Sequence, residues 1–219
     1  FIHDVCLENI DVTFAIDRAG IVGEDGPTHT GSFDISFMRC IPNIVISCPS
    51  NEHELWHLLN ICYEHKGPAA IRYPRGSGIG VQPIPNEIEG FEIGKAKKIK
   101  DGQSVCILNF GVLMDQIDQI AEKKNYTLYD MRFIKPIDED ALEHAMQHET
   151  IITLEDNTLL GGCGSAVGEK LHKQKFKGNL LSIGLKDEFP AHGSRNEILR
   201  QNGLDEESIQ KTIDDFLRN

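Results

Sequence analysis

Three short runs near the start of the chain are apolar at nearly every position, instead of alternating between polar and apolar residues. They are VTFAID at 12–17, NIVISC at 43–48 and AAIRY at 69–73. Such continuous runs are typical of strands in parallel sheets that helices cover on both faces. The pattern therefore predicts three buried strands in this part of the chain.

The segment between the second and third runs, PSNEHELWHLLNICYEHKG, has the period of an amphipathic helix. Within this segment, Ser50 is a favourable N-cap residue and Gly67 is a favourable residue to end the helix. A helix in this position would cross from one parallel strand to the next. Its apolar face would be formed by Leu55, Leu58, Leu59 and Cys62.

Strand and helix patterns alternate again in the second half of the chain. Strands that alternate with helices indicate an α/β fold with a largely parallel sheet in each half. The run SRNE at 194–197 is a capping box that opens a helix. Further helices are expected near 114–124, 139–147 and 165–173. The strand-like runs of this half are SVCILNF, YTLYDM, TIITLE and NLLSIG.

Between the two halves the composition changes to Gly, Pro and Lys, without long apolar runs. We interpret residues 77–102 as a connector, which divides the chain into one domain over 1–76 and a second over 103–219. The first residue is Phe1, and FIHDVCLEN has the pattern of the end of an amphipathic helix. We therefore expect the chain to be a piece of a longer protein.

The composition narrows the classes of partner and the cellular compartment. The 219 residues are 40% hydrophobic and carry a formal net charge of -12, which argues against nucleic acid or an anionic membrane as a partner. No apolar run approaches about 20 residues, and no signal peptide is recognisable, so we expect no membrane helix. Six cysteines without a CxxC pair indicate reduced core thiols and a cytoplasmic protein.

Polar residues follow the three predicted strands of the first half. Arg18, Ser50 and Arg75 come after the first, second and third strand, and Asp25 and His29 lie in the loop after the first. In open parallel sheets, ligands bind outside the carboxyl ends of the strands, so we expect these residues to share one edge. Two arginines at this edge indicate a bound phosphate or carboxylate.

A structural alternative exists for each of these residues. Each arginine could simply pair with an aspartate such as Asp17. His29, in the segment PTHT, could be a solvated loop residue. The proximity of Arg18, Arg75 and His29 at one sheet edge favours the functional interpretation.

Two segments resemble metal motifs, and we predict that neither binds a metal. HELWH at 53–57 fits the zinc signature HExxH, with Glu87 as a possible third ligand. Glu87 lies in the connector instead of on a following helix, and HELWH already belongs to the crossover helix. Its histidines, His53 and His57, are expected to be exposed or rim residues. GEDG at 23–26 breaks the spacing of a GDG motif, and Asn51 downstream is expected to cap its own helix.

Longer segments resemble the transketolase family. They are AIDRAGIVGEDGPTH, AIRYPRG, LYDMRFIKPID and EDNTLLGGCGSAV, and the resemblance covers essentially the whole chain. It implies an incomplete transketolase pyrimidine-binding domain followed by a transketolase C-terminal domain. It also implies a homodimer that uses thiamine diphosphate and Mg²⁺, with the diphosphate and metal sites in a segment that this chain does not include. No cofactor-binding residue is therefore assigned in this chain, which alone is expected to be inactive.

The branch of the family with DRAG and YPRG condenses pyruvate with D-glyceraldehyde 3-phosphate and releases carbon dioxide. The resemblance implies that Arg18 and Arg75 hold the acceptor phosphate and that Asp25 holds an acceptor hydroxyl. It implies that His29 donates to the oxygen that becomes an alkoxide. The alternative is a non-catalytic α/β module that supports dimer assembly, with structural arginines in the loop.

Overall fold

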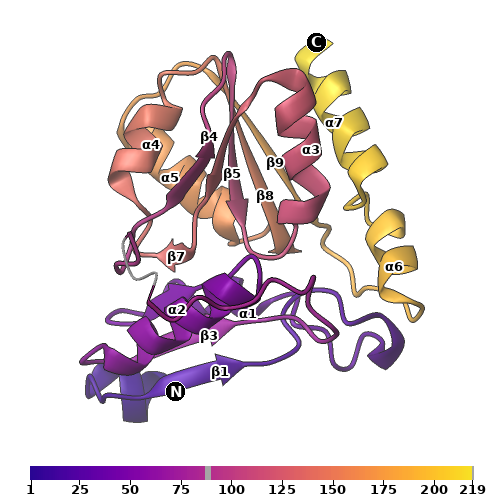
Figure 1. Ribbon diagram of the computed structural model, residues 1–219. Helices are drawn as coiled ribbons and strands as arrows, with labels where there is room; N and C mark the ends of the chain where they lie inside the picture. The colour runs from indigo at the N-terminus through magenta and orange to yellow at the C-terminus, as the bar shows by residue number, and fades with distance from the viewer. Residues whose placement is uncertain (87–89, 219) are drawn as a thin grey trace.

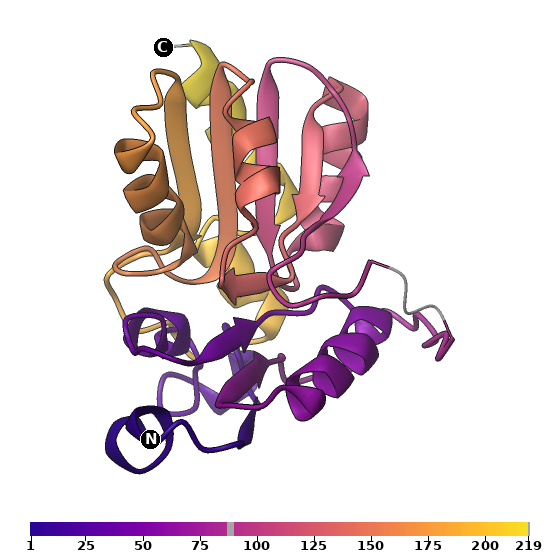
Figure 2. The same cartoon turned by 90° about the vertical axis from the view of Figure 1, so that its left-hand side faces the viewer.

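Two β-sheets, one above the other, organise the chain in the computed structural model, which describes residues 1–86 and 90–218 (Figure 1). The first sheet has the strand order β1-β3-β2-β7, and the second has the order β4-β6-β5-β8-β9. Helices cover both faces of the second sheet (Figures 1 and 2). The prediction of two α/β domains with largely parallel sheets is confirmed.

The three apolar runs of the first half form the parallel part of the first sheet. They become β1 (Thr13–Ile16), β2 (Val45–Ser47) and β3 (Ala69–Arg72), and β3 pairs in parallel with both neighbours. A fourth strand, β7 (Phe133–Lys135), comes from the second half of the chain and pairs antiparallel with β2. The sequence analysis did not predict β7, which ties the second half to the first sheet.

In the second sheet, β5 (Val105–Phe110), β6 (Thr127–Asp130), β8 (Thr150–Thr158) and β9 (Asn179–Leu185) are parallel. The edge strand β4 (Lys97–Lys100) pairs antiparallel with β6. It lies inside the segment 77–102 that we interpret as a connector, and the sequence analysis did not predict it. Its sequence KKIK is mostly exposed, as is common for an edge strand protected by lysines.

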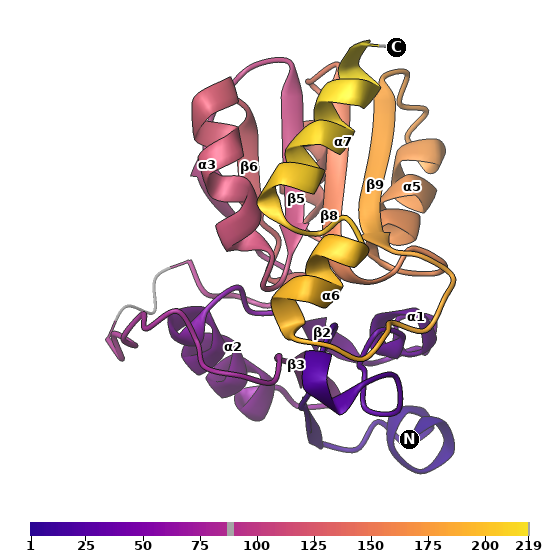
Figure 3. The same ribbon diagram turned by 90° about the vertical axis from the view of Figure 1, so that its right-hand side faces the viewer.

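The helices of the second half form the two outer layers. α4 (Glu139–Ala145) and α5 (Cys163–Lys173) lie on one face, and α3 (Met114–Lys124) and α7 (Glu206–Arg218) lie on the other (Figures 1 and 3). α6 (Arg195–Gln201) lies where the second sheet meets the first half of the chain (Figure 3). We call the first half, with the first sheet, the first unit, and the second half the second unit. The Ser194–Glu197 capping box opens α6 as predicted.

The first half contains α1 (Asp34–Met38), α2 (Glu52–Glu64) and the short turns η1 (Ile2–Leu7) and η2 (Gly23–Asp25). The predicted N-cap of α2 was wrong by one residue. Asn51, not Ser50, accepts a hydrogen bond from the Glu54 backbone N–H, at 3.0 Å. The expectation that Asn51 caps its own helix is confirmed.

One apolar core runs through both units. Ile46 and Cys48 of the first sheet belong to the same buried cluster as Leu108 and Phe110 of the second. All six cysteines are free thiols, and Cys40 alone among them is exposed. None of the helices in the described part of the chain is long and apolar enough to cross a membrane.

Candidate active site at the junction of the two units

The carboxyl ends of β1 and β3 lie side by side, because Ile16 is paired with Arg72 in the parallel register. The backbone N–H of Tyr73 donates to Ile16 O, and the N–H of Ala19 donates to Tyr73 O. Arg18, between these two bonds, has a positive φ of 63°. The two chain segments that leave the sheet therefore stay in contact as they reach Arg18 and Arg75.

Arg18 and Arg75 converge on one carboxylate oxygen. Asp25 Oδ2 lies 3.1 Å from Arg18 Nε and 3.2 Å from Arg75 Nε, and Arg18 also pairs with its neighbour Asp17. The side chains of Arg18 and Arg75 are 40% and 42% exposed. The structure thus brings together three predicted site residues, while Asp17 supplies the structural partner that the alternative interpretation anticipated.

A cleft of about 680 Å³ opens beside the two arginines. Arg18, Ser50 and Arg75 line it from the first unit. The second unit also contributes to the wall, which the sequence analysis did not foresee. Its lining residues are Val112, Asp115, Gln116, Arg195 and Asn196.

His29 is exposed on the loop that also carries Asp25, and it is not among the residues that line the cleft. Its Nδ1 lies 2.9 Å from the hydroxyl of Thr28, which is also exposed. In this chain the structure therefore brings Arg18, Asp25 and Arg75 together and leaves His29 on the surface of the same loop.

Ser50 connects the cleft to a buried acid. Its hydroxyl donates to Asp130 Oδ2 at 2.5 Å, at the end of β6. Burial, and after it the nearby Glu54 carboxylate, raise the pKa of the Asp130 carboxyl to about 7, against the lowering effects of Ser50 and Arg132. Ser50 is thus fixed in the cleft wall by an acid that titrates near neutral pH.

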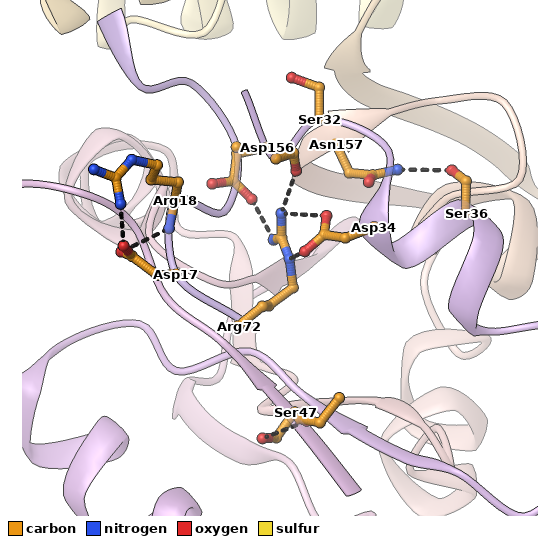
Figure 4. Close-up of polar contacts among 12 residues, drawn as sticks. Asp17, Arg18, Ser32, Asp34, Ser36, Ser47, Arg72, Asp156 and Asn157 are labelled. Atoms are coloured by element: carbon orange, nitrogen blue, oxygen red, sulfur yellow. Dashed lines mark hydrogen bonds and ion pairs between the residues drawn. The ribbon is translucent and has the colours of Figure 1, made fainter. Parts of the chain in front are cut away.

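A buried arginine of β3 joins an aspartate of α1 to an aspartate of β8 (Figure 4). Arg72 donates through Nε and Nη2 to the two oxygens of Asp34, at 2.9 and 3.1 Å, and through Nη1 to Asp156 Oδ1 at 2.6 Å. Arg72 and Asp156 side chains are each 2% exposed. The sequence contained one signal for this pair, since Arg72 lies within the apolar run AAIRY and Asp156 directly follows the apolar run TIITLE.

His53 and His57 of HELWH are buried and hold the connector segment, so the expectation that they are exposed or rim residues was wrong. The N–H of Ile84 donates to His53 Nδ1 at 3.2 Å, and His57 Nε2 lies 3.0 Å from Ile84 O. The His57 ring stacks on Phe91 with centroids 4.3 Å apart. Glu87, the possible third ligand, lies outside the described residues. Over residues 1–86 and 90–218, no group of three or more His, Cys, Asp or Glu side chains is arranged to hold a metal ion.

Comparison with protein families gives two matches that together cover most of the chain. The model for the transketolase pyrimidine binding domain matches residues 1–79, and the model for the transketolase C-terminal domain matches residues 94–209. This chain belongs to the transketolase family. The resemblance drawn from the sequence motifs is thereby confirmed.

Within the transketolase family, the chain is similar to 1-deoxy-D-xylulose-5-phosphate synthases. It is 48% identical over 218 residues to the one from Idiomarina loihiensis and 50% identical over 218 residues to the one from Mannheimia succiniciproducens. Each alignment covers 99% of this chain and 35% of the relative. The chain thus spans about a third of the length of the curated relatives that it matches.

Two solved structures of the transketolase family share the fold. One is described as "Split gene transketolase, inactive beta4 tetramer"; it has a TM-score of 0.84 at 24% identity, over 98% of this chain and 69% of that chain. A transketolase from Campylobacter jejuni has a TM-score of 0.66 at 20% identity, over 92% of this chain and 31% of that chain. Both similarities cover the two units of this chain together.

Proposed function

We propose that this chain is part of a thiamine-diphosphate-dependent synthase that condenses pyruvate with D-glyceraldehyde 3-phosphate. The products are 1-deoxy-D-xylulose 5-phosphate, a precursor for isoprenoid, thiamine and pyridoxal biosynthesis, and carbon dioxide. The observation that carries the proposal is the convergence of Arg18 and Arg75 on Asp25 beside the cleft. The similarity to 1-deoxy-D-xylulose-5-phosphate synthases supports this reaction over others in the transketolase family.

Arg18 and Arg75 would bind the phosphate of the acceptor aldehyde. Each uses its Nε towards Asp25 and Arg18 uses Nη1 towards Asp17, so Nη2 of Arg18 and the Nη groups of Arg75 remain available for phosphate oxygens. A guanidinium binds a phosphate through paired, charge-assisted hydrogen bonds, which fix its orientation as well as its charge. The two arginines would therefore select a phosphorylated acceptor and place its aldehyde end away from the sheet edge.

Asp25 would position the two guanidinium groups through its Oδ2. Its Oδ1 would accept a hydrogen bond from a hydroxyl of the acceptor aldehyde. His29 would donate a proton to the carbonyl oxygen that gains negative charge when the aldehyde is attacked. Histidine side chains commonly serve as general acids in such proton transfers. The exposed position of His29 fits a residue whose substrate is held by further parts of the intact protein.

Thiamine diphosphate, when bound, supplies the carbanion chemistry of the reaction. Following the family resemblance, we propose that the diphosphate and its Mg²⁺ are held by a segment outside this chain, and we assign them to no residue of it. We propose that the functional protein is a cytoplasmic homodimer, without nucleic acid or membrane partners. We also propose that this 219-residue chain alone neither binds thiamine diphosphate tightly nor turns over substrate.

The proposal is tested by the release of carbon dioxide from pyruvate by the intact gene product. We expect release that requires thiamine diphosphate and Mg²⁺ and increases strongly when D-glyceraldehyde 3-phosphate is added. Formation of 1-deoxy-D-xylulose 5-phosphate would be measured in the same samples. Cofactor binding without any use of pyruvate would contradict the proposed reaction. Turnover by the purified 219-residue chain would contradict its proposed inactivity.

A further inference from the structure

A third arginine lines the cleft, and it comes from the second unit. Arg195 is the first residue of α6, and it lines the same cleft as Arg18 and Arg75. The sequence analysis noticed only the capping box around it. Arg18 and Arg75 follow strands of the first sheet, so the three arginines approach the cleft from both units.

Unlike the other two arginines, Arg195 forms no ion pair with a carboxylate among residues 1–86 and 90–218. Its Nε is buried and makes no hydrogen bond within the part of the chain that the structure describes, and no ion pair is formed there. Asp115 also lines the cleft; burial raises the pKa of this carboxyl, while Arg195 acts to lower it. A buried N–H without an acceptor is unfavourable, and an oxygen atom of a ligand in the cleft would satisfy it.

The backbone of Arg195 is held against the loop that carries Asp25. A Cβ added to Gly23 would lie 2.6 Å from the Arg195 backbone N, so only glycine allows this approach, at its φ of 72°. The Ser194–Glu197 capping box also fixes the first turn of α6, which contains Arg195. Arg195 is thus placed relative to Asp25, and through Asp25 relative to Arg18 and Arg75.

We propose that Arg195 is a third phosphate-binding residue, which donates from Nε to an oxygen of the acceptor phosphate. This inference rests on the proposed function, since the phosphate is that of the acceptor aldehyde. A phosphate monoester has three terminal oxygens, which three guanidinium groups can share. Binding the acceptor would then require both units, and the C-terminal unit would determine substrate preference as well as support the fold.

The direct test follows the arginine Nε–H signals of the ¹⁵N-labelled chain by NMR while inorganic phosphate or D-glyceraldehyde 3-phosphate is added. The Arg195→Lys variant identifies the Arg195 signal. We expect the signals of Arg18, Arg75 and Arg195 to shift together, and the signal of Arg200, exposed on the same helix, to stay in place. Shifts at Arg18 and Arg75 without one at Arg195 would overturn the inference and leave the proposed function standing. The absence of shifts at all three would overturn the phosphate site altogether.

Kinetics of the intact gene product give a second, independent test. Arg195→Gln is expected to raise KM for D-glyceraldehyde 3-phosphate about 10-fold, as for a lost charge-assisted hydrogen bond, and to leave KM for pyruvate unchanged. Arg195→Lys should show a smaller rise in KM, because lysine keeps the positive charge but lacks the forked donor groups of arginine. Arg200→Gln is the matched control and should behave as the wild type. If the wild type prefers the phosphorylated aldehyde and Arg195→Gln has the same KM for it as the wild type, the role of Arg195 is contradicted.

Discussion

At the scale of single residues, one carboxylate oxygen of Asp25 holds both sheet-edge arginines. Arg18 Nε and Arg75 Nε lie 3.1 and 3.2 Å from it. Three of the four residues in this group of Asp17, Arg18, Asp25 and Arg75 come from the loop after β1, and Arg75 comes from the segment after β3. Asp25 therefore positions two cations that would otherwise repel each other, and the site depends on its carboxylate as much as on the arginines.

His29 is predicted to take part in catalysis without affecting stability. In the intact gene product, His29→Ala should lower kcat by roughly 100-fold, because a proton donor at a developing alkoxide typically contributes that much. The melting temperature should not change, since His29 is exposed and its ring hydrogen-bonds to the exposed Thr28. His172→Ala, an exposed histidine on α5, is the control. A near-normal kcat for His29→Ala would return His29 to the role of a solvated loop residue.

Asp130 is predicted to make stability depend on pH. Its pKa is raised to about 7 in the folded chain, mainly by burial, whereas an unfolded aspartate has a pKa of about 3.9. Between these values the folded state binds more protons than the unfolded state, so the contribution of Asp130 to stability falls as pH rises from about 4 to about 7. Asp130→Asn cannot ionise, so its unfolding free energy relative to the wild type should increase over this window.

Urea unfolding at several pH values between 4 and 7.5 measures this effect. The exposed Asp187→Asn variant is the control, and its difference from the wild type should not follow the same trend. A difference between Asp130→Asn and the wild type that stays constant with pH would show that Asp130 has the same protonation in the folded and unfolded states.

The sequence predicted the residues at the strand ends better than those that approach from the second unit. Arg18 and Arg75 follow from the rule that ligands bind at the carboxyl ends of parallel strands. Their meeting at Asp25 depends on the positive φ of Arg18 and on the turns around it, which local composition does not specify. Arg195 and the Arg72–Asp156 pair depend on how two units pack together, and no pattern within one segment encodes that packing.

At the scale of secondary structure, the predictions succeeded where a pattern was long and failed where an element was short. α3 begins and ends where the periodicity predicted, at Met114–Lys124. β7 has three residues and β4 has four, too few for periodicity, and both are antiparallel edge strands. The sequence analysis did not separate α7 from the helix opened by SRNE, because only residues 202–205 lie between the two helices.

The N-cap of α2 is predicted to be worth about 1 kcal/mol. Asn51→Ala removes the acceptor for the Glu54 backbone N–H and should lower the free energy of unfolding by about this amount. Asn51→Ser keeps a side-chain acceptor and should retain most of the stability. Chemical unfolding of the two variants and the wild type provides the measurement. Equal stability of Asn51→Ala and the wild type would mean that water replaces the cap without cost.

At the scale of the whole molecule, the two units share a core and buried ion pairs. The largest apolar cluster includes Ile46 and Phe110 from different sheets. Arg132 of the second unit donates to both oxygens of Glu54 in α2, at 2.7 and 2.8 Å. Because a buried ion pair that loses one partner leaves an unpaired buried charge, such contacts couple the two units strongly. The units are therefore expected to unfold in one transition.

Arg72→Met is predicted to destabilise the whole chain. It leaves Asp34 and Asp156 buried without their cation, so the free energy of unfolding should fall by about 3–5 kcal/mol. Lys66→Met is the control, because Lys66 pairs with Asp11 at the surface, where the cost should be below about 1 kcal/mol. Circular dichroism and tryptophan fluorescence should report one common transition for each variant. A loss in Arg72→Met as small as that in Lys66→Met would contradict the role assigned to Arg72.

The preference for a phosphorylated acceptor tests the central claim most directly, since Arg18 and Arg75 are proposed to bind the acceptor phosphate. The intact gene product and its Arg18→Ala, Arg75→Ala and Arg200→Ala variants would be compared with D-glyceraldehyde 3-phosphate and with unphosphorylated D-glyceraldehyde. We predict that the wild type and Arg200→Ala strongly prefer the phosphorylated aldehyde. Each of the other two variants should lose roughly 10- to 100-fold in kcat/KM for that substrate alone. Wild-type preference in both Arg18→Ala and Arg75→Ala would contradict the claim and place the phosphate elsewhere.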